Sequence, residues 1–262
     1  MFDVVKPVTN DFFQWAYFLF VRYWPLFFNG IKATLLIALS GTILGLLIGL
    51  LVGGVRATKV NRTDTLLARW SKRLLHLASS IYIEVFRGTP MMVQAVFIYY
   101  SLKPALGWSP MTAGIVIVSI NTGAYMAEII RAGIQSVPSG QSEAALSLGM
   151  TPWQSMMNII LPQAIRNAFP AIGNEFVVNI KDSSVLNVIS VTEVYFQTSS
   201  VAGTFFKFKE AFFVAASIYL VLTFTTTRIL AIIEKRLDST MGVSGSQTVP
   251  KAIVKHHGDK EY

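Results

Sequence analysis

The sequence contains no cysteine and has little charge for its length. Of its 262 residues, 14% are Asp, Glu, Lys or Arg, whereas soluble globular proteins carry about 25%. The absence of cysteine excludes a disulfide framework, a thiolate zinc or iron–sulfur site and a cysteine nucleophile. The three histidines, His76, His256 and His257, are too few to indicate a histidine-rich metal site. The low charge is concentrated between long apolar blocks, which favours a polytopic membrane protein.

Several blocks of the chain are long and apolar enough, or nearly so, to cross a bilayer. A hydrocarbon core of about 30 Å requires roughly 20 mostly apolar helical residues. We therefore predict an all-α polytopic membrane protein whose membrane domain covers residues 30–240, with about five transmembrane helices over 31–55, 74–101, 111–130, 168–194 and 211–233. The second and fourth blocks carry charged residues, so they are expected to face the bundle interior or a wet cavity.

The charge that is present has a one-sided distribution. The net charge is +8, and the basic residues flank the apolar blocks, which favours a lipid surface over nucleic acid as the partner. Most Lys and Arg residues lie in one set of alternate loops. The positive-inside rule then places the N-terminus outside and the C-terminus in the cytoplasm.

The two ends of the chain differ from the centre. The aromatic stretch 12–28 lacks the basic start and cleavage site of a secretory signal. Within an outer segment at 1–29, we expect it to form an interfacial helix. An additional transmembrane helix is the alternative, against which Arg22 and Pro25 argue. The polar tail at 241–262 is expected to be disordered and cytoplasmic.

The first apolar block carries a glycine at every fourth position. Such a stripe forms one smooth face of a helix and allows another helix to approach closely. It predicts packing rather than chemistry, and consists of Gly41, Gly45, Gly49 and Gly53.

The segment 138–162 lies on the predicted cytoplasmic side and reads as two short helices. Pro138 ends the preceding helix, and a first short helix closes at Gly149. Thr151 is expected to cap a second helix, which should stop near Pro162 because proline lacks an N–H donor. The segment contains more apolar residues than a solvated linker, so either they pack on the helix ends or they dock into another protein.

The sequence of this segment resembles a known signature. Glu143–Pro162 (EAALSLGMTPWQSMMNIILP) is similar to the EAA motif of ABC importer permeases. Three further stretches resemble the polar amino-acid branch of that family, which works with histidine-, glutamine-, arginine- or cystine-binding proteins. They are YIEVFRGTPMMVQAVFIYY (82–100), GAYMAEIIRAGIQSVPSGQ (123–141) and FPAIGNEFVVNIKDSSVLNVIS (169–190).

The resemblance implies an importer in a bacterial cytoplasmic (inner) membrane, with no catalytic site in this chain. Two permease subunits, identical or related, would form the pore, two ATPase subunits would bind ATP and Mg, and an extracytoplasmic binding protein would deliver the amino acid. No cofactor would bind this chain. The EAA loop would act as a coupling helix against the ATPase through Glu143, Ala144, Ala145, Gly149, Leu161 and Pro162. Alternatively, Glu143 only stabilises its own helix N-terminus.

The chain lacks the GxxxxGK[ST] phosphate loop, so its energy source must be a partner or an ion gradient. An ion-driven secondary amino-acid carrier is the alternative function. A membrane-embedded enzyme would need a motif such as HExxH, or a nucleophile with a base, and the sequence offers no such set.

Polar residues within the third and fourth blocks are the candidates for contact with substrate. An amino-acid zwitterion needs a donor for its carboxylate and an acceptor for its ammonium group. The candidates are Asn121, Thr122, Tyr125, Glu175, Lys181, Asp182 and Ser183. For Lys181 and Asp182 a structural ion pair is the alternative, and for Asn121 an interhelical hydrogen bond. Adjacent residues of a regular helix point about 100° apart, so Lys181 and Asp182 could converge only on an unwound helix.

Two acid–base pairs with a three-residue spacing are expected to form salt bridges. They are Glu84 with Arg87, just before the helix-breaking Pro90, and Glu128 with Arg131. For the first pair, a role in gating is the alternative.

Overall fold

The computed structural model describes residues 5–58 and 65–239, and this part of the chain contains helices and no strand. The predicted all-α fold is therefore confirmed. The tail predicted to be disordered lies outside the described residues. The elements are α1 (Phe12–Arg22), α2 (Trp24–Ala57), α3 (Leu66–Gly88), α4 (Met91–Leu106), α5 (Pro110–Gln135), α6 (Ser139–Ser147), α7 (Pro152–Ser155), the π-helix η1 (Met156–Ile160), α8 (Leu161–Asp182), the 3-10 helix η2 (Ser183–Ile189), α9 (Val194–Phe205) and α10 (Phe208–Ser239).

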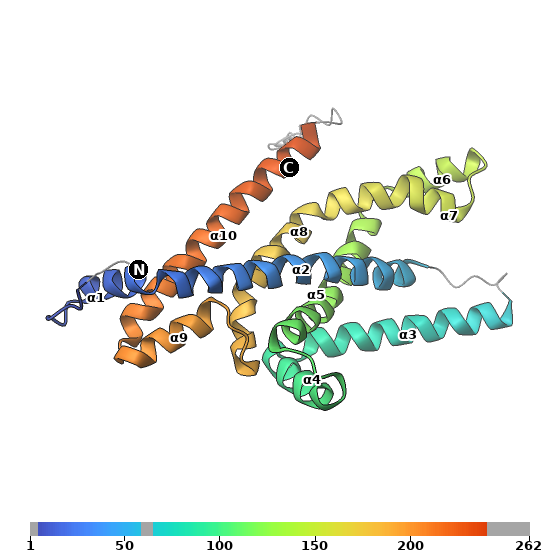
Figure 1. The fold of residues 1–262 in the computed structure, drawn as a ribbon. Helices are drawn as coiled ribbons and strands as arrows, with labels where there is room; N and C mark the ends of the chain where they lie inside the picture. The colour runs from blue at the N-terminus through green and yellow to red at the C-terminus, as the bar shows by residue number, and fades with distance from the viewer. Residues whose placement is uncertain (1–4, 59–64, 240–262) are drawn as a thin grey trace, which may run out of the picture.

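Long helices dominate the arrangement, and the short ones lie at its ends. Figure 1 shows α6 and α7 at one end of the bundle and α1 and α9 at the other. Within the described residues, α2, α5 and α10 are each long and apolar enough to cross a membrane. The bent pair α3 and α4 would provide a fourth crossing if it counts as one span.

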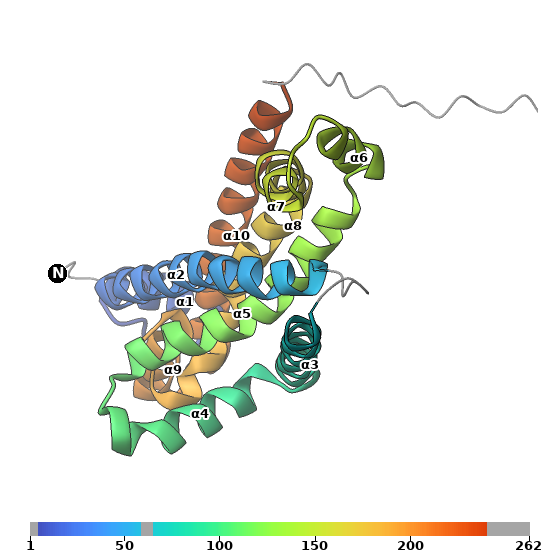
Figure 2. The same ribbon diagram turned by 90° about the vertical axis from the view of Figure 1, so that its right-hand side faces the viewer.

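Helices α2 and α5 pack closely along the glycine stripe (Figure 2). A Cβ atom added at Gly41 would lie 2.5 Å from Val118 Cγ1, and one added at Gly45 would lie 2.9 Å from Thr122 Cβ. Real Cβ contacts essentially never fall below 3.0 Å. The close approach predicted from the glycine spacing is confirmed, and the partner is α5.

The block expected as one helix over 74–101 is divided into α3 and α4, and the chain bends by 112° between them. Thr89, just before Pro90, has an extended backbone (φ −123°, ψ 146°), as the proline ring favours for its predecessor. Gln94 Nε2 donates to the carbonyl oxygens of Phe86 and Thr89, both at 2.9 Å, and so satisfies groups freed by the break. This sharp bend, here called the α3–α4 elbow, lies at the proline that the sequence analysis identified as helix-breaking.

The predicted stop near Pro162 is wrong, because the helical path continues from α7 through η1 into α8. Pro162 lies in the first turn of α8 and directly follows the π-helical turn. Leu161 N–H bonds to the carbonyl of Met156, five residues back. This wider turn lets the chain pass a residue that lacks an N–H donor.

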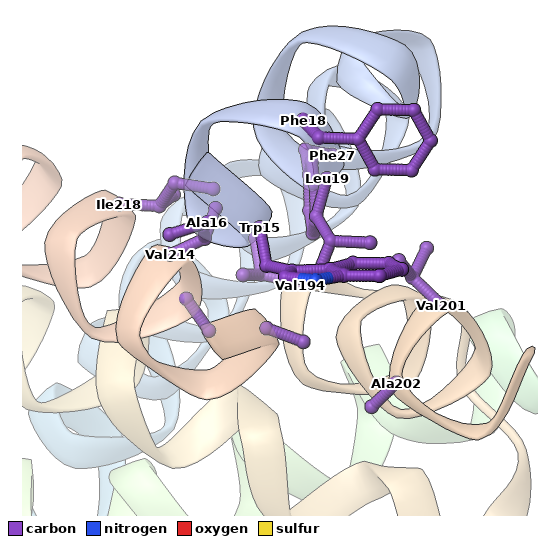
Figure 3. Packing of buried hydrophobic residues seen from close by; sticks show 12 residues of the cluster. Trp15, Ala16, Phe18, Leu19, Phe27, Val194, Val201, Ala202, Val214 and Ile218 are labelled. Atoms are coloured by element: carbon purple, nitrogen blue, oxygen red, sulfur yellow. The ribbon is translucent and has the colours of Figure 1, made fainter. Parts of the chain in front are cut away.

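The aromatic N-terminal stretch forms two helices rather than one. Helix α1 ends at Arg22, Tyr23 leaves helical geometry, and Pro25 lies in the first turn of α2, a position that its fixed φ favours. Figure 3 shows the apolar cluster that joins α1 to the start of α2, to α9 and to α10. Its labelled members include Trp15, Phe18, Leu19, Phe27 and Val194. The cluster fixes α1 to the bundle by packing.

A buried hydrogen-bond chain ties α2, α5 and α8 together. Asn179 Nδ2 donates to Thr42 Oγ1 at 2.9 Å, and Thr122 Oγ1 donates to Asn179 Oδ1 at 3.0 Å. All three side chains are buried. Unpaired polar atoms that are buried lower the stability of the fold, so these hydrogen bonds specify how the three helices fit together.

Replacing Thr122 with valine is expected to lower the free energy of unfolding by about 1 kcal/mol, because Asn179 Oδ1 loses its donor. The matched control, Thr122→Ser, retains the hydroxyl and should stay closer to wild type. Thermal unfolding of the purified protein in detergent measures the difference. Equal stability of the two variants would show that the hydrogen bond contributes nothing.

Candidate functional site

A cavity of about 550 Å³ opens beside the α3–α4 elbow, between α5 and α8. Three segments that are distant in sequence build it, and each contributes polar groups. The lining residues are Arg87, Gly88, Thr89, Pro90 and Met91 from the elbow, Asn121 and Tyr125 from α5, and Glu175, Val178, Asn179 and Asp182 from α8. We call this space the elbow cavity.

Helix α8 contributes one continuous face to the elbow cavity. Glu175, Asn179 and Asp182 follow each other at four and three residues, which places them on one side of a helix with 3.6 residues per turn. Both carboxylates are half-buried. The regular helix ends at Asp182, and the 3-10 helix η2 follows. A change in helix geometry thus lies beside Asp182, at the position where the sequence allowed for unwinding.

Helix α5 contributes Asn121 and Tyr125, one turn apart as predicted. Asn121 Nδ2 donates to Gln94 Oε1 at 2.9 Å and to the carbonyl of Phe86 at 3.3 Å. The interhelical hydrogen bond considered for Asn121 is therefore present, and it fastens α5 to the elbow. Asn121 still lines the elbow cavity.

Arg87 is the main lining residue that sequence reasoning missed. It was expected to pair with Glu84, yet within the described residues no salt bridge joins the two. Its guanidinium instead lies 5.3 Å from the centre of the Tyr125 ring, within the range of a cation–π contact. In the sequence, Arg87 stands directly before Gly88-Thr89-Pro90, where the helix breaks. At this break Arg87 lines the same cavity as residues of α5 and α8.

Three of the predicted substrate residues lie outside the lining of the elbow cavity. Thr122 is occupied by its bond to Asn179. Ser183 is fully buried and donates to the carbonyl of Ile180 at 2.9 Å. Lys181 is exposed. The elbow cavity thus gathers Asn121, Tyr125, Glu175 and Asp182 from the predicted set and adds Arg87 and Asn179.

The second predicted salt bridge is confirmed. Arg131 Nη2 lies 2.8 Å from Glu128 Oε2, three residues away on α5. Glu128 also binds Arg56 of α2. One carboxylate therefore links two arginines near the end of α2 that faces α6 and α7.

The segment carrying the EAA motif forms an exposed turn between two capped helices. Helix α6 closes with Gly149 at φ +84°, and the bonds Gly149 N–Leu146 O (3.0 Å) and Met150 N–Ala145 O (3.1 Å) complete a Schellman motif. Thr151 and Gln154 form the predicted capping box at the start of α7. The two helices are therefore held at a defined angle by backbone geometry.

Much of this turn is exposed among the described residues. Glu143 and Ala144 are exposed, Ala145 is buried, and Leu148 and Trp153 are 85% and 71% exposed. Glu143 is the fifth residue of α6, and the first turn contains no acidic residue, so Glu143 lies beyond the reach of the helix N-terminus. Leu161 and Pro162 begin α8 behind the turn. We call the exposed residues Glu143, Ala144, Leu146, Leu148, Trp153 and Met157 the EAA surface.

Within residues 5–58 and 65–239, no group of three His, Asp or Glu side chains is placed to hold a metal ion. The polar groups that line the elbow cavity can offer hydrogen bonds and charge to a small molecule.

The chain is similar to known proteins in sequence and in fold. The family model for the inner membrane component of binding-protein-dependent transport systems matches residues 65–239. The glutamine transport system permease protein GlnP of Escherichia coli (strain K12) is 37% identical over 216 residues, covering 81% of this chain and 93% of that protein. The L-cystine transport system permease protein TcyB of Bacillus subtilis (strain 168) is 36% identical over 219 residues, covering 82% and 88%. A solved amino acid ABC transporter with histidines gives a TM-score of 0.74 at 37% identity, covering 87% of this chain and 100% of that one.

Proposed function

Because the chain belongs to the family of inner membrane components of binding-protein-dependent transport systems, we propose that it moves polar amino acids across the membrane through the elbow cavity. The chain is a permease subunit of an ABC importer with the type I permease fold. Permease subunits of this family are non-catalytic and act with an ATPase and a binding protein. ATP and Mg belong to that ATPase, so this chain supplies the path.

The observation that carries the proposal is that side chains of opposite charge line the elbow cavity. Arg87 can bind the α-carboxylate of an amino acid, and Glu175 or Asp182 can bind its ammonium group. A cavity with both a fixed donor and fixed acceptors is complementary to a zwitterion. The helix break beside Asp182 supports the proposal, because transporter sites form where helices are interrupted.

The EAA surface would receive the motion of the ATPase. A short helix with a fixed end moves together with the helix that follows it, and α6 is closed at its C-terminus by Gly149 and followed by α7, which begins with a capping box. Its exposed apolar residues would fill a groove of the ATPase, with Glu143 at the polar edge. We assign the predicted coupling role to this surface, with Leu161 and Pro162 linking it through α8 to the elbow cavity.

The proposed assembly follows the predicted topology. With α8 and η2 as a crossing beside the four that length and composition allow, five crossings would place the N-terminus outside and the C-terminus in the cytoplasm of a bacterial inner membrane, with α1 at the outer interface. Two permease subunits, as identical or related chains, would pair above two ATPase subunits. The apolar exposed faces of α2 and α10 would contact lipid or the second permease subunit.

A panel of labelled compounds tests the substrate class. The complete complex of permease, ATPase and binding protein, reconstituted in vesicles with ATP on the ATPase side, is expected to accumulate a polar amino acid. Sugars and apolar amino acids should not compete. Accumulation of a sugar, an inorganic ion or a peptide in place of an amino acid would contradict the proposal.

A further inference from the structure

We propose that an anionic phospholipid binds beside the EAA surface, with an acyl chain in an apolar groove and its phosphate at a basic face of α3. The groove shares no lining residue with the elbow cavity. The inference rests on the proposed function for one point only, which is that the EAA surface lies on the ATPase side of the membrane.

The groove has a volume of about 780 Å³ and lies where the end of α2 meets α5, α7, η1 and the start of α8. Figure 1 shows this end of α2 and the start of α3 on the same side of the bundle as α6 and α7. Its lining residues are Leu50, Leu51, Gly54, Val55, Ala57, Thr58, Lys72, Ile130, Ile134, Pro152, Trp153, Met156, Met157 and Leu161. We call this space the α2–η1 groove.

The wall of the α2–η1 groove is apolar and partly open. Leu51, Trp153 and Met157 line it and are exposed among the described residues. An apolar surface of this kind is covered favourably by an apolar ligand. Helices α2 and α5 are each long and apolar enough to cross a membrane, and their ends form the wall. The groove is therefore placed where acyl chains and headgroups of a bilayer leaflet meet.

One rim of the α2–η1 groove is basic. Among the described residues that line the groove, Lys72 of α3 is the one charged side chain. His76 Nε2, one turn further along α3, lies 3.3 Å from Oγ1 of Thr58, which also lines the groove. Arg69 and Arg73 lie three residues before Lys72 and one after it, so all four share one face of the helix. This basic face of α3 is therefore turned toward the groove.

A different face of α3 is apolar. Its residues Leu67, Trp70, Leu74 and Leu77 are all exposed, and their spacing places them together on the helix. A helix with separate basic and apolar faces is typical of a lipid surface. Anionic headgroups of the cytoplasmic leaflet attract Lys and Arg at that level. An apolar groove with a basic rim is complementary to a ligand that has an apolar chain and an anionic head.

The ATPase is the alternative occupant, since Trp153 and Met157 belong both to the EAA surface and to the groove wall. The tip of the EAA surface, with Glu143 and Leu148, does not line the groove. The opposite wall is formed by Leu50, Leu51 and other residues of a helix able to cross the membrane. A partner outside the membrane reaches the tip, whereas a lipid reaches the groove.

Quenching of tryptophan fluorescence by brominated phospholipids tests the site. The permease–ATPase complex is placed in nanodiscs of phosphatidylcholine that contain a minor fraction of phosphatidylglycerol, with bromine on the acyl chains of one lipid or the other. The share of Trp153 is the difference in quenching between wild type and Trp153→Phe. We expect phosphatidylglycerol to quench this share about fivefold more strongly per mole than phosphatidylcholine, the factor given by one basic residue near an anionic lipid.

Variants locate the head and the chain of the lipid. Lys72→Gln and Arg73→Gln should each bring the quenching by the two lipids close to equality, and Lys235→Gln, an exposed charge on α10 outside the groove, is the matched control. Gly54→Phe places a ring in the groove, and nothing lies within 4 Å of a Cβ built there. This variant should fold and should reduce the quenching of Trp153 by both lipids.

Three results would overturn the inference. Equal quenching by the two lipids in wild type would mean that bulk lipid enters the groove without recognition. An unchanged preference in Lys72→Gln and Arg73→Gln would remove the basic face from the site. Absence of Trp153 quenching by either lipid would show that the ATPase or the second permease subunit fills the groove.

The quenching assay needs neither ATP nor substrate, so its outcome is separate from that of the uptake assay. A complex that prefers phosphatidylglycerol at Trp153 but accumulates no amino acid in vesicles would reject the proposed function alone. A complex that accumulates an amino acid but shows no such preference would reject the lipid site alone.

Discussion

Replacing Gly149 with valine is expected to abolish most substrate uptake while the permease remains in the membrane and bound to its ATPase. Gly149 has φ +84°, and no atom lies within 4 Å of a Cβ built there. The effect therefore comes from backbone strain rather than from a clash. A left-handed conformation costs an L-residue about 1–2 kcal/mol, and a β-branched residue more. The Schellman closure of α6 should open, and the angle between α6 and α7 should change.

In Gly149→Val, ATP-driven uptake is expected to fall by roughly tenfold or more. Basal ATP hydrolysis should remain, because the ATPase itself is unaltered. Gly149→Asn is the matched control, since asparagine tolerates left-handed geometry. Gly140→Ala places a larger residue in the same helix, where a Cβ meets open space, and should transport normally. Wild-type uptake by Gly149→Val would show that this turn does not transmit force.

Replacing Gly49 with leucine is expected to prevent folding of the permease. A Cβ added there would lie 2.8 Å from the carbonyl carbon of Met126 and 2.9 Å from the amide nitrogen of Ala127. Both are backbone atoms of α5, so no side-chain rotation relieves the overlap. Overpacking typically costs about 1–3 kcal/mol, and here the most extensive helix–helix contact of the described chain must separate.

Gly54→Leu is the matched control for Gly49→Leu. Gly54 lies on the same helix, and nothing approaches within 4 Å of a Cβ built there. We expect its yield of folded protein to match wild type by gel filtration in detergent, while Gly49→Leu yields aggregated or degraded protein. Equal yields of both variants would contradict the packing of α2 on α5.

Local sequence rules predicted the features of this fold that depend on neighbouring residues. The glycine spacing predicted the smooth face of α2, and Thr151, Pro152 and Gln154 predicted the start of α7. Gly149 predicted the end of α6. In each case one or two residues fix the backbone, so a short stretch of sequence is sufficient.

Features that depend on distant segments were not predictable in the same way. Pro90 signals a break, but the 112° elbow depends on Gln94 and Asn121 reaching the freed carbonyl groups. Pro162 reads as a stop, yet the π-helical turn lets the helix continue. Thr122 was predicted to contact the substrate, but its hydroxyl donates to Asn179 of α8, a partner that the sequence alone does not reveal. Partners distant in the chain decide the elbow and Thr122, and an irregular local turn decides Pro162.

The energy source of uptake tests the central claim most directly. Uptake of a labelled amino acid by the complete reconstituted complex should require ATP on the ATPase side and persist when ionophores abolish all ion gradients. It should stop when the ATPase is replaced by a variant that binds but does not hydrolyse ATP. Uptake driven by an ion gradient, in vesicles that contain this chain without the ATPase, would contradict the assignment as an ABC importer permease.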